Sequence, residues 1–338
     1  MEVKEITQED CNKWNDYVMN HPDGTFYHLI GWKNVVEKTY GHKSYYYMVL
    51  DDKQIEGILP LFLIKSKLFG TKLVSLPFAN YGGILTDNAE AEKLLVNKSK
   101  EVFKELNADY LEFRYLSEHN IEITNKIYNT FILQLTLNPE ELWNKFDKKV
   151  RNSTRNAIKS NLKFKIGPKY INDFYRIYSK NMKEKGTPTH SFNFFRNIQN
   201  HLNTNVSVVL YEDRVIASLF LLFYKNTVTA GWGSSLSEYL KFSPNNLLYW
   251  ESIKYACGNN YKFFDFGRSR ENVGTYDFKK KWNPEQKQLY YQYFLNENKE
   301  MPDTSQLNPK RKIFSKVWLS LPNIMTNLLG PKIRKNMP

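Results

Sequence analysis

The sequence predicts a mixed α/β protein made of two modules whose strands are largely antiparallel. The runs "SYYYMVLDD" and "QIEGILPLFLIKS" are rich in β-branched and aromatic residues, and the short polar turn between them predicts a hairpin. The run "VSVVLYEDRVIASLFLLFYKNTVTAGWGSS" predicts a three-stranded meander with Glu-Asp-Arg and Lys-Asn turns. In each half of the chain helices precede these strands, and a helix and a further strand follow them, so the same order of elements occurs twice.

Helical periodicity supports this order of elements. Leu29, Trp32, Val35 and Val36 fall on one face of a predicted helix. A further helix is expected after Asn138, which is followed by a proline and acidic residues as at many helix starts. The other expected helices cover residues 9–20, 28–40, 89–106, 170–184, 191–202 and 245–259.

The length of 338 residues is sufficient for two domains. We expect a first domain at residues 1–135, a second at 136–300, and a basic amphipathic tail at 301–338. In the tail, "NPKRKIFSKVWLSLPNIMTNLLGPKIRK", basic clusters flank an apolar stretch that would suit an anionic membrane surface. The alternative is a helix packed on the second domain.

The composition indicates a polyanionic partner. The net charge is +13 and the pI is near 9.3, which suits nucleic acid, a nucleotide-linked substrate or an anionic membrane face. A general bias toward lysine and asparagine is the alternative. The two cysteines, Cys11 and Cys257, and the scattered histidines predict neither a disulfide framework nor a metal site. With no apolar leader, we expect a cytoplasmic protein that reaches at most the inner face of the membrane.

The segment "FDFGRSRENVGTYDFKKKW" carries the main candidate site. Its apolar run places Asp265 and Arg268 at the end of a strand, where sites of α/β proteins usually lie. In the loop expected after it, at least one lysine of the run that follows Phe278 should face inward. Such a lysine could stabilise a developing oxyanion or hold a phosphate. The alternative is a strand-end ion pair beside a solvated lysine run.

Residues 145–165 are expected to form a strongly basic helix. This segment holds eight lysines and arginines against one acid, Asp147, and could follow a nucleic-acid backbone. Arg151 and Arg155 share a helix face and are the leading phosphate contacts, with Lys159 and Lys280 as further candidates. A solvated helix face is the alternative.

Six segments, in order along the chain, resemble the FemAB-like family. Its signature of Phe-Lys after a glycine, in a loop behind the strand "(F/Y)DFG", resembles "FDFGRS…GTYDFKKKW". The other matching segments are "FYHLIGWKNVVEKTYGHKSYY", "LPFANYGGILTD", "KKVRNSTRNAIKSNLKF", "KEKGTPTHSFNFF" and "LSEYLKFSPNNLLYWESIKYA". The tail looks like those of family members found near exopolysaccharide gene clusters.

The resemblance implies two GNAT-like acyltransferase domains and an aminoacyltransferase activity. The donor would be aminoacyl-tRNA, and the acceptor an amine of a nucleotide- or lipid-linked, peptidoglycan-like precursor of the cell envelope. The activated ester would drive this aminolysis, so positioning and oxyanion stabilisation would dominate catalysis.

The resemblance also assigns roles to residues of this sequence. Lys279, together with Phe278, would be catalytic. The Gly-Pro pair that is usual in the family is absent beside Tyr81. Lys185 lies near the position where the family has an arginine. For Trp32 and Trp232, packing in the core is the alternative role. The residues expected to bind substrate are Trp32, Lys38, Tyr81, Gly82, Lys185, Trp232, Asp265 and Arg268.

No cofactor is expected. Acetyl-CoA enzymes of the GNAT type hold pyrophosphate on a Q/R-x-x-G-x-G/A turn at a helix start, and "SSLSEYLKFSPNN" stands in its place here. Acetyl-CoA is therefore disfavoured. The rival hypothesis is a GNAT-like N-acyltransferase that uses another activated acyl donor to modify exopolysaccharide or envelope glycan. A third hypothesis is a non-catalytic basic adaptor at the membrane.

Overall fold

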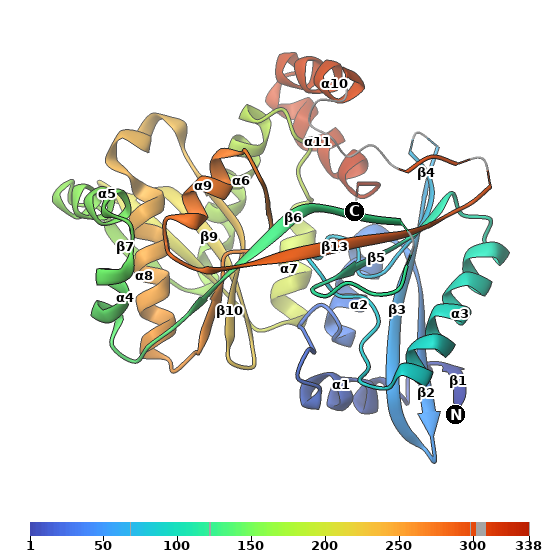
Figure 1. The fold of residues 1–338 in the computed structure, drawn as a ribbon. Helices are drawn as coiled ribbons and strands as arrows, with labels where there is room; N and C mark the ends of the chain where they lie inside the picture. Colours follow the sequence, from blue (N-terminus) through green and yellow to red (C-terminus); the bar gives the residue numbers. More distant parts are fainter. Residues whose placement is uncertain (68, 122, 298, 302–308, 338) are drawn as a thin grey trace. The chain divides into compact units, whose positions relative to one another are not determined.

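The computed structural model describes residues 1–67, 69–121, 123–297, 299–301 and 309–337 (Figure 1). Contacts divide the chain into two compact units. The first contains Met1–Ile127, Gln288–Thr304 and Lys335–Pro338, and the second contains Tyr128–Lys287 and Ser305–Arg334. Each unit combines a largely antiparallel sheet with helices, which confirms the predicted α/β fold class.

The first unit is a sheet with strand order β1-β2-β3-β4-β5-β13, in which only the β4–β5 pair is parallel. Its strands are β1 (Glu2–Glu5), β2 (Lys43–Asp51), β3 (Gln54–Ser66), β4 (Gly70–Val74), β5 (Tyr110–Tyr115) and β13 (Glu285–Leu295). Its helices are α1 (Cys11–Asn20), α2 (Ile30–Tyr40) and α3 (Ala89–Glu105). The predicted hairpin is β2–β3.

Alternating side chains of β2 and β3 supply both faces of this sheet. Leu59 and Leu61 belong to the core that includes Leu95 of α3. On the opposite face, Tyr46 packs against Trp14 of α1, with ring centroids 4.9 Å apart. Helix α3 begins at Asn88, whose side chain accepts hydrogen bonds from the backbone N–H groups of the first turn.

The second unit is a sheet with strand order β6-β11-β10-β9-β8-β7, in which only the β10–β11 pair is parallel. Its strands are β6 (Ile123–Gln134, beginning in the first unit), β7 (Lys163–Ile166), β8 (Thr204–Tyr211), β9 (Arg214–Tyr224), β10 (Thr227–Ser235), β11 (Phe263–Asp265) and β12 (Ser269–Arg270). Its helices are α4 (Pro139–Lys145), α5 (Lys148–Lys159), α6 (Ile171–Glu184), α7 (Phe192–His201), α8 (Pro244–Gly258), α9 (Gly274–Lys280), α10 (Pro309–Ser320) and α11 (Asn323–Arg334).

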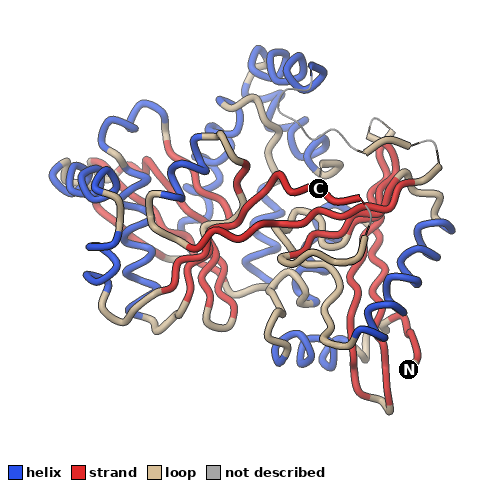
Figure 2. Tube along the Cα trace, in the orientation of Figure 1, coloured by secondary structure: helices blue, strands red, loops and turns tan. Residues whose placement is uncertain are grey.

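Helices cover both faces of the predicted meander β8–β9–β10, whose strands are neighbours in Figure 2. Phe220 of β9 packs against Phe174 of α6 and Phe195 of α7. Phe223 lies an odd number of residues further along the strand and packs instead against Tyr255 of α8. The meander is thus the central layer of the unit.

Two segments differ from their expected secondary structure. The basic segment 145–165 is not one helix, because α4 ends at Lys145 and Asp147 caps a new helix, accepting a hydrogen bond from the backbone N–H of Lys149. Lys163 and Lys165 lie on strand β7. The lysine run, expected in a loop, belongs to the short helix α9 and the residue after it.

The bounds of the units also differ from the expected ones. Residue 135 follows β6, which begins in the first unit and ends in the second, and β13 brings the chain back to pair with β5. The tail packs on the second unit, as in the alternative considered above, where Ser315 donates a hydrogen bond to the carbonyl of Gly186 (3.1 Å). Residues 302–308 of the expected tail lie outside the described residues. Among the described helices, none has both the length and the apolarity needed to cross a membrane.

Candidate functional site

Lys279 of α9 is a buried lysine held at the end of a strand. Its side chain is 8% exposed, and its ammonium donates hydrogen bonds to the carbonyls of Gly267 (2.8 Å) and Arg268 (2.9 Å), just beyond β11. An ammonium has three N–H donors, so these two bonds leave one for a further acceptor. Lys280 and Lys281 are exposed, so one lysine of the run faces inward.

Burial lowers the pKa of Lys279 to about 7, because the charged form loses its hydration. The negative charge of Asp265 opposes this shift, and the positive charge of Arg268 adds to it. Lys279 therefore changes charge close to neutral pH. Perturbed groups of this kind are concentrated at functional sites, although structural networks contain them too.

Asp265 fixes the backbone that Lys279 contacts. It is fully buried at the end of β11, and it accepts hydrogen bonds from the hydroxyl of Thr130 (2.7 Å) and the backbone N–H of Gly267 (2.8 Å). Gly267 has a φ of +73°, a conformation that a side chain would strain. The guanidinium of Arg268 lies 4.8 Å from the ring centre of Tyr128. The expected ion pair between Asp265 and Arg268 stays a prediction.

In the sheet of the second unit, strands β10 and β11 separate beside Asp265 and Lys279. Strands β10 and β11 pair only from Thr227–Phe263 to Thr229–Asp265. Beyond that point β10 continues along β9 through a bulge at Gly231, while the backbone N–H of Phe266 bonds the carbonyl of Phe131 in β6. An opened sheet edge presents backbone donors and acceptors to a ligand. Lys279 contacts the chain where this opening begins.

Aromatic rings pack around Phe278, the residue that precedes Lys279. Phe278 packs against Tyr249 of α8 (5.2 Å between ring centres) and against Trp282 (6.0 Å). Tyr249 also stacks on Phe266 at 5.6 Å. Phe278 and Trp282 both pack on Tyr249, which holds α9, the helix that carries Lys279, against α8.

The exposed lysines lie beside the start of α5. The backbone N–H of Asp147 donates to the carbonyl of Lys281 (3.0 Å). Around this contact lies a pocket of about 510 Å³, lined by Lys145, Asp147, Asp277, Lys280, Lys281 and Asn283. Two basic segments more than 100 residues apart in sequence therefore meet here, and two aspartates offset part of their charge.

The phosphate-contact candidates differ in exposure. Arg151 is half-buried, and its Nε–H has no hydrogen-bond partner among the described residues. Arg155 is exposed, with its guanidinium 5.4 Å from the ring centre of Trp143, and Lys159 is exposed in the last turn of α5. A buried donor without a partner is costly, so a ligand oxygen at Arg151 would remove that cost.

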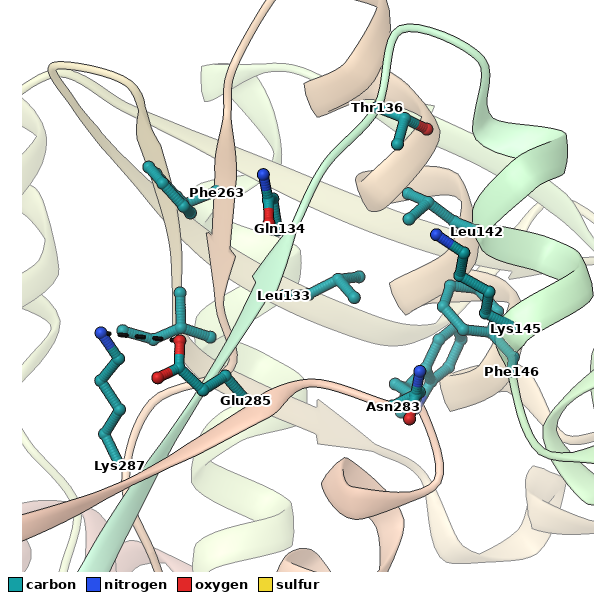
Figure 3. Close-up of a pocket in the computed structure, with 12 residues that line it drawn as sticks. Leu133, Gln134, Thr136, Leu142, Lys145, Phe146, Phe263, Asn283, Glu285 and Lys287 are labelled. Atoms are coloured by element: carbon teal, nitrogen blue, oxygen red, sulfur yellow. Dashed lines mark ion pairs between the residues drawn. The ribbon is translucent and has the colours of Figure 1, made fainter.

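A second pocket, of about 430 Å³, lies near the end of β6 (Figure 3). Phe263, Glu285 and Lys287 lie on one side of it, and Lys145, Phe146 and Asn283 on the other. Glu285 and Lys287 form an ion pair at 3.6 Å. Sequence reasoning had assigned no role to this hollow.

In the first unit, the expected acceptor-binding residues are mostly packing residues. Trp32 is fully buried, and its indole N–H donates to the carbonyl of Pro77 (3.2 Å). Tyr81 is 8% exposed and packs edge-on against Tyr27. Lys38 is exposed in the last turn of α2. Of these three, only Lys38 offers a charged group to solvent.

The glycine turn after Tyr81 is fixed by its geometry. The backbone N–H of Gly82 donates to the carbonyl of Arg114 (2.7 Å), and a Cβ at this position would overlap Leu76. Gly83 has a φ of +101°, and a Cβ there would overlap the ring of Tyr115. Glycine is therefore required at position 83, while a side chain at position 82 would have to displace Leu76.

In the second unit, the two further candidates Lys185 and Trp232 lie on other elements than Lys279. Lys185 caps the end of α6 and is exposed. Trp232 lies beside the bulge of β10 and packs edge-on against Phe195 (5.2 Å) and Phe194 (5.7 Å). It is partly exposed, so it both packs in the core and reaches the surface.

One group of possible metal ligands occurs among the described residues: His21, Asp23 and Asp87, whose ligand atoms lie within 4.8 Å of one another. The Nδ1 atom of His21 accepts the backbone N–H of Asp23 (3.2 Å), and Nε2 lies 3.5 Å from the Asp87 carboxylate. These two contacts are those of a structural histidine that links the turn at Asp23 to Asp87. Sequence spacing missed it because Asp87 is far along the chain.

Sequence reasoning also missed the partners that hold the site. Thr130, Tyr128 and Tyr249 come from β6 and α8, and neither element carries a motif that marks them. Their roles follow only from the pairing of β6 with β11 and from the packing of α8.

Comparison with known proteins defines the class of the second unit. A family model described as an acetyltransferase (GNAT) domain matches residues 144–280. This segment, which includes Lys279, is therefore similar to acyltransferase domains of the GNAT type. A search of the curated proteins finds no match.

Solved structures share the fold over most of the chain. FemX is 18% identical with a TM-score of 0.66, over 86% of this chain and 97% of FemX. The C-terminal domain of an Agrobacterium fabrum protein described as a lysylphosphatidylglycerol synthetase is 13% identical, with a TM-score of 0.55, over 84% and 91% of the two chains. A tandem GNAT protein from the clavulanic acid biosynthesis pathway is 9% identical, with a TM-score of 0.54, over 87% and 98%. The expected resemblance to the FemAB-like family is thus confirmed in the fold.

Proposed function

We propose that this acyltransferase moves an amino acid from aminoacyl-tRNA to an amine of a peptidoglycan-like precursor of the cell envelope. The observation that carries the proposal is Lys279, a buried cation with a pKa of about 7 and two backbone carbonyls as partners. It lies in the GNAT domain, beside the opening between β10 and β11.

The reaction is aminolysis of an ester. The acceptor amine attacks the ester carbonyl carbon, a C–N bond forms, and the C–O bond to the ribose breaks. The proton lost by the amine ends on the ribose hydroxyl that leaves. In its charged form, Lys279 would direct its third N–H to the carbonyl oxygen as negative charge develops there. Burial strengthens this interaction because the local dielectric is low.

A basic surface supports the choice of tRNA as donor. Lys280, Lys281 and the start of α5 adjoin the Lys279 segment, and Arg151 holds a donor without a partner among the described residues. Contacts of lysine and arginine with phosphates give affinity without sequence specificity, which suits an enzyme that reads the aminoacyl end. Since tRNA is cytoplasmic, we place the reaction in the cytoplasm.

The acceptor is the less constrained partner. We propose a nucleotide- or lipid-linked precursor, for which Lys38, Lys185 and Trp232 provide exposed or partly exposed groups. The buried Trp32 and Tyr81 would act by holding the fold around such a site. A lysine at position 185 would contact a phosphate as a point charge, without the two-pronged geometry of arginine.

The GNAT domain also favours a second candidate, an N-acyltransferase with another activated donor. The 3₁₀ turn Ser237–Phe242 precedes α8, and its sequence holds no glycine-rich pyrophosphate turn. Acetyl-CoA is therefore the less favoured donor, and the proposed enzyme needs no cofactor.

Ribonuclease sensitivity decides between the two donors. The purified protein is mixed with envelope precursors, labelled amino acids and an aminoacylation system, or with labelled acyl-CoA. We expect transfer of label to the precursor only from the aminoacylation system, and its loss after ribonuclease treatment. Transfer that survives ribonuclease and needs acyl-CoA would establish the second candidate instead. Binding without transfer in either mixture would support a non-catalytic adaptor.

A further inference from the structure

The two C-terminal helices expose an unusual number of apolar side chains. Sixteen large apolar residues are exposed in the described part of the chain, and seven of them lie between Ile313 and Leu329. Ile324 is 74% exposed, Leu328 65% and Ile313 63%. Exposed apolar residues that gather on one segment in this way mark an interaction site more often than residues that are scattered singly.

Packing fixes which way these helices face. Thr326 and Gly330 lie on the inner side of α11, where a Cβ on Gly330 would crowd Thr189 at 2.8 Å. Ile324 and Leu328 share the outer side, one helical turn apart. In α10, Trp318 is 2% exposed while Val317 is 56% exposed. The apolar face is therefore turned outward by the fold.

The charge of the segment is of one sign. Residues 309–337 contain no aspartate or glutamate and seven basic residues: Lys310, Arg311, Lys312, Lys316, Lys332, Arg334 and Lys335. Lys316 and Lys332 are exposed on the same two helices as the apolar residues (Figure 1, red). Basic residues beside an outward apolar face are the pattern of helices that lie on anionic lipid.

A basic pocket adjoins this face. It has a volume of about 240 Å³, and its lining includes Arg176, Lys180, Lys183 and Arg214, together with Asn323 and Asn327 of α11. Asn323 and Asn327 immediately precede Ile324 and Leu328, so the pocket and the apolar face share one helix.

Two of the four basic side chains that line the pocket form hydrogen bonds with uncharged groups. Lys183 donates to the amide oxygen of Asn323 (2.6 Å), and Arg214 to the hydroxyl of Tyr239 (3.3 Å). The others have acidic neighbours: Lys180 pairs with Glu238 at 2.9 Å, and Arg176 with Asp173 at 3.5 Å. Lys183 and Arg214 thus supply most of the net positive charge that faces the pocket.

We propose that α10, α11 and this pocket form a docking surface for a membrane that carries anionic phospholipid. Ile324, Leu328 and their apolar neighbours enter the interfacial layer, and Lys183 and Arg214 face a lipid phosphate. The surface holds the enzyme on the bilayer as a peripheral protein. This inference goes beyond the proposed transfer reaction and does not depend on its donor or acceptor.

Vesicle flotation with the full-length protein tests the proposal. Vesicles of phosphatidylcholine alone are compared with vesicles of phosphatidylcholine and phosphatidylglycerol, without any substrate. We expect binding to the anionic vesicles that weakens with added salt. The double variant Ile324→Ser/Leu328→Ser should lower the partition constant by about tenfold or more, because each apolar group contributes to insertion. Lys183→Gln should also weaken binding.

Matched variants serve as controls. Leu137→Ser/Ile158→Ser removes two exposed apolar side chains outside the tail, at 82% and 52% exposure, and should leave binding unchanged. Circular dichroism checks that every variant is folded. Failure of the wild-type protein to bind anionic vesicles, or equal losses in tail and control variants, would overturn the proposal. Binding to an acidic polypeptide such as polyglutamate but not to vesicles would replace the membrane with a protein partner.

Discussion

At Lys279, two opposing effects act on one ammonium group. Burial removes its water and disfavours the charge, while two carbonyls and Asp265 favour the charge. The resulting pKa of about 7 leaves comparable amounts of both forms near neutrality. A small change in the surroundings, such as an arriving carbonyl oxygen, can therefore select the charged form.

Lys279→Met should lower the rate of transfer by roughly tenfold or more, because one donor to a developing oxyanion is lost. Single-turnover kinetics with saturating acceptor measures the effect. Lys280→Met, which removes an exposed lysine from the same run, is the control and should keep most of the chemical rate. Equal rates for the wild type and Lys279→Met would remove this lysine from the reaction.

The same shift predicts how stability depends on pH. The unfolded chain has the ordinary lysine pKa of 10.5, and folding lowers it to about 7. Between these values the unfolded state binds more protons, so the contribution of Lys279 to stability rises with pH across this window. Urea unfolding at pH 7 and pH 9 should show wild type gaining stability relative to Lys279→Met. A stability difference between wild type and Lys279→Met that stays constant from pH 7 to pH 9 would contradict the low pKa of Lys279.

Gly83 offers a test of the turn that follows Tyr81. Gly83→Ala should lower the free energy of unfolding by about 1–3 kcal/mol, because alanine is strained at a positive φ and meets the Tyr115 ring. Gly258→Ala is the matched control, since nothing lies within 4 Å of its Cβ position at the end of α8. It should be neutral or slightly stabilising, by up to ~1 kcal/mol. Equal losses in the two variants would show that the Gly83 geometry is unimportant.

Helix α5 is separated from α4 by a short break at Phe146 and Asp147. Phe146 is buried and Asp147 caps the new helix, so the basic residues of α4 and α5 lie on separate elements. Val150, Thr154 and Ala157 form the buried side of α5, and most of the remaining residues are charged or polar. The helix is anchored by its small residues while its outer face stays available for phosphates.

Arg151→Ala/Arg155→Ala should weaken binding of tRNA and lower the magnitude of its salt dependence by about one to two units of slope, one for each lost phosphate contact. Fluorescence anisotropy with labelled tRNA over a series of salt concentrations measures both quantities. Lys98→Ala/Lys126→Ala, a charge-matched change in the first unit, should leave the slope unchanged. A slope that changes equally in both double variants would indicate a diffuse charge effect.

At the scale of the molecule, the chain returns to its first unit at Gln288, before the C-terminal helices of the second unit. Strand β13 supplies Gln292, which is fully buried beside His119, Ile121 and Thr124. Its side chain donates to the carbonyl of His119 (2.8 Å) and the hydroxyl of Thr124 (2.9 Å), and it accepts from the backbone N–H of His119 (3.1 Å). The sheet of the first unit therefore needs a strand that is translated after most of the second unit.

Gln292→Leu should lower the free energy of unfolding by about 1–3 kcal/mol, because it leaves partly buried backbone groups of His119 without their side-chain partner. Hydrogen exchange should become faster in residues 119–124 in particular. Gln286→Leu, an exposed position on the same strand, should change stability by less than about 0.5 kcal/mol. Unchanged exchange at 119–124 would mean that the return of the chain does not stabilise this loop.

The sequence was sufficient for the local elements. The helices expected at 28–40, 89–106 and 245–259 occur at Ile30–Tyr40, Ala89–Glu105 and Pro244–Gly258. The hairpin and the meander are also confirmed. These elements are set by periodicity, turn residues and caps within a few residues of one another, so the chain itself carries the information.

The sequence by itself determined the fold class, the resemblance to acyltransferases, and a lysine run in which one member should face inward. Only the tertiary structure decided that this member is Lys279, that its partners are two carbonyls, and that its pKa is lowered. Only the tertiary structure also decided that Thr130 holds Asp265 and that the tail packs on α6. These facts depend on contacts between residues far apart in the chain, and burial, which sets both charge and exposure, exists only once those contacts have formed.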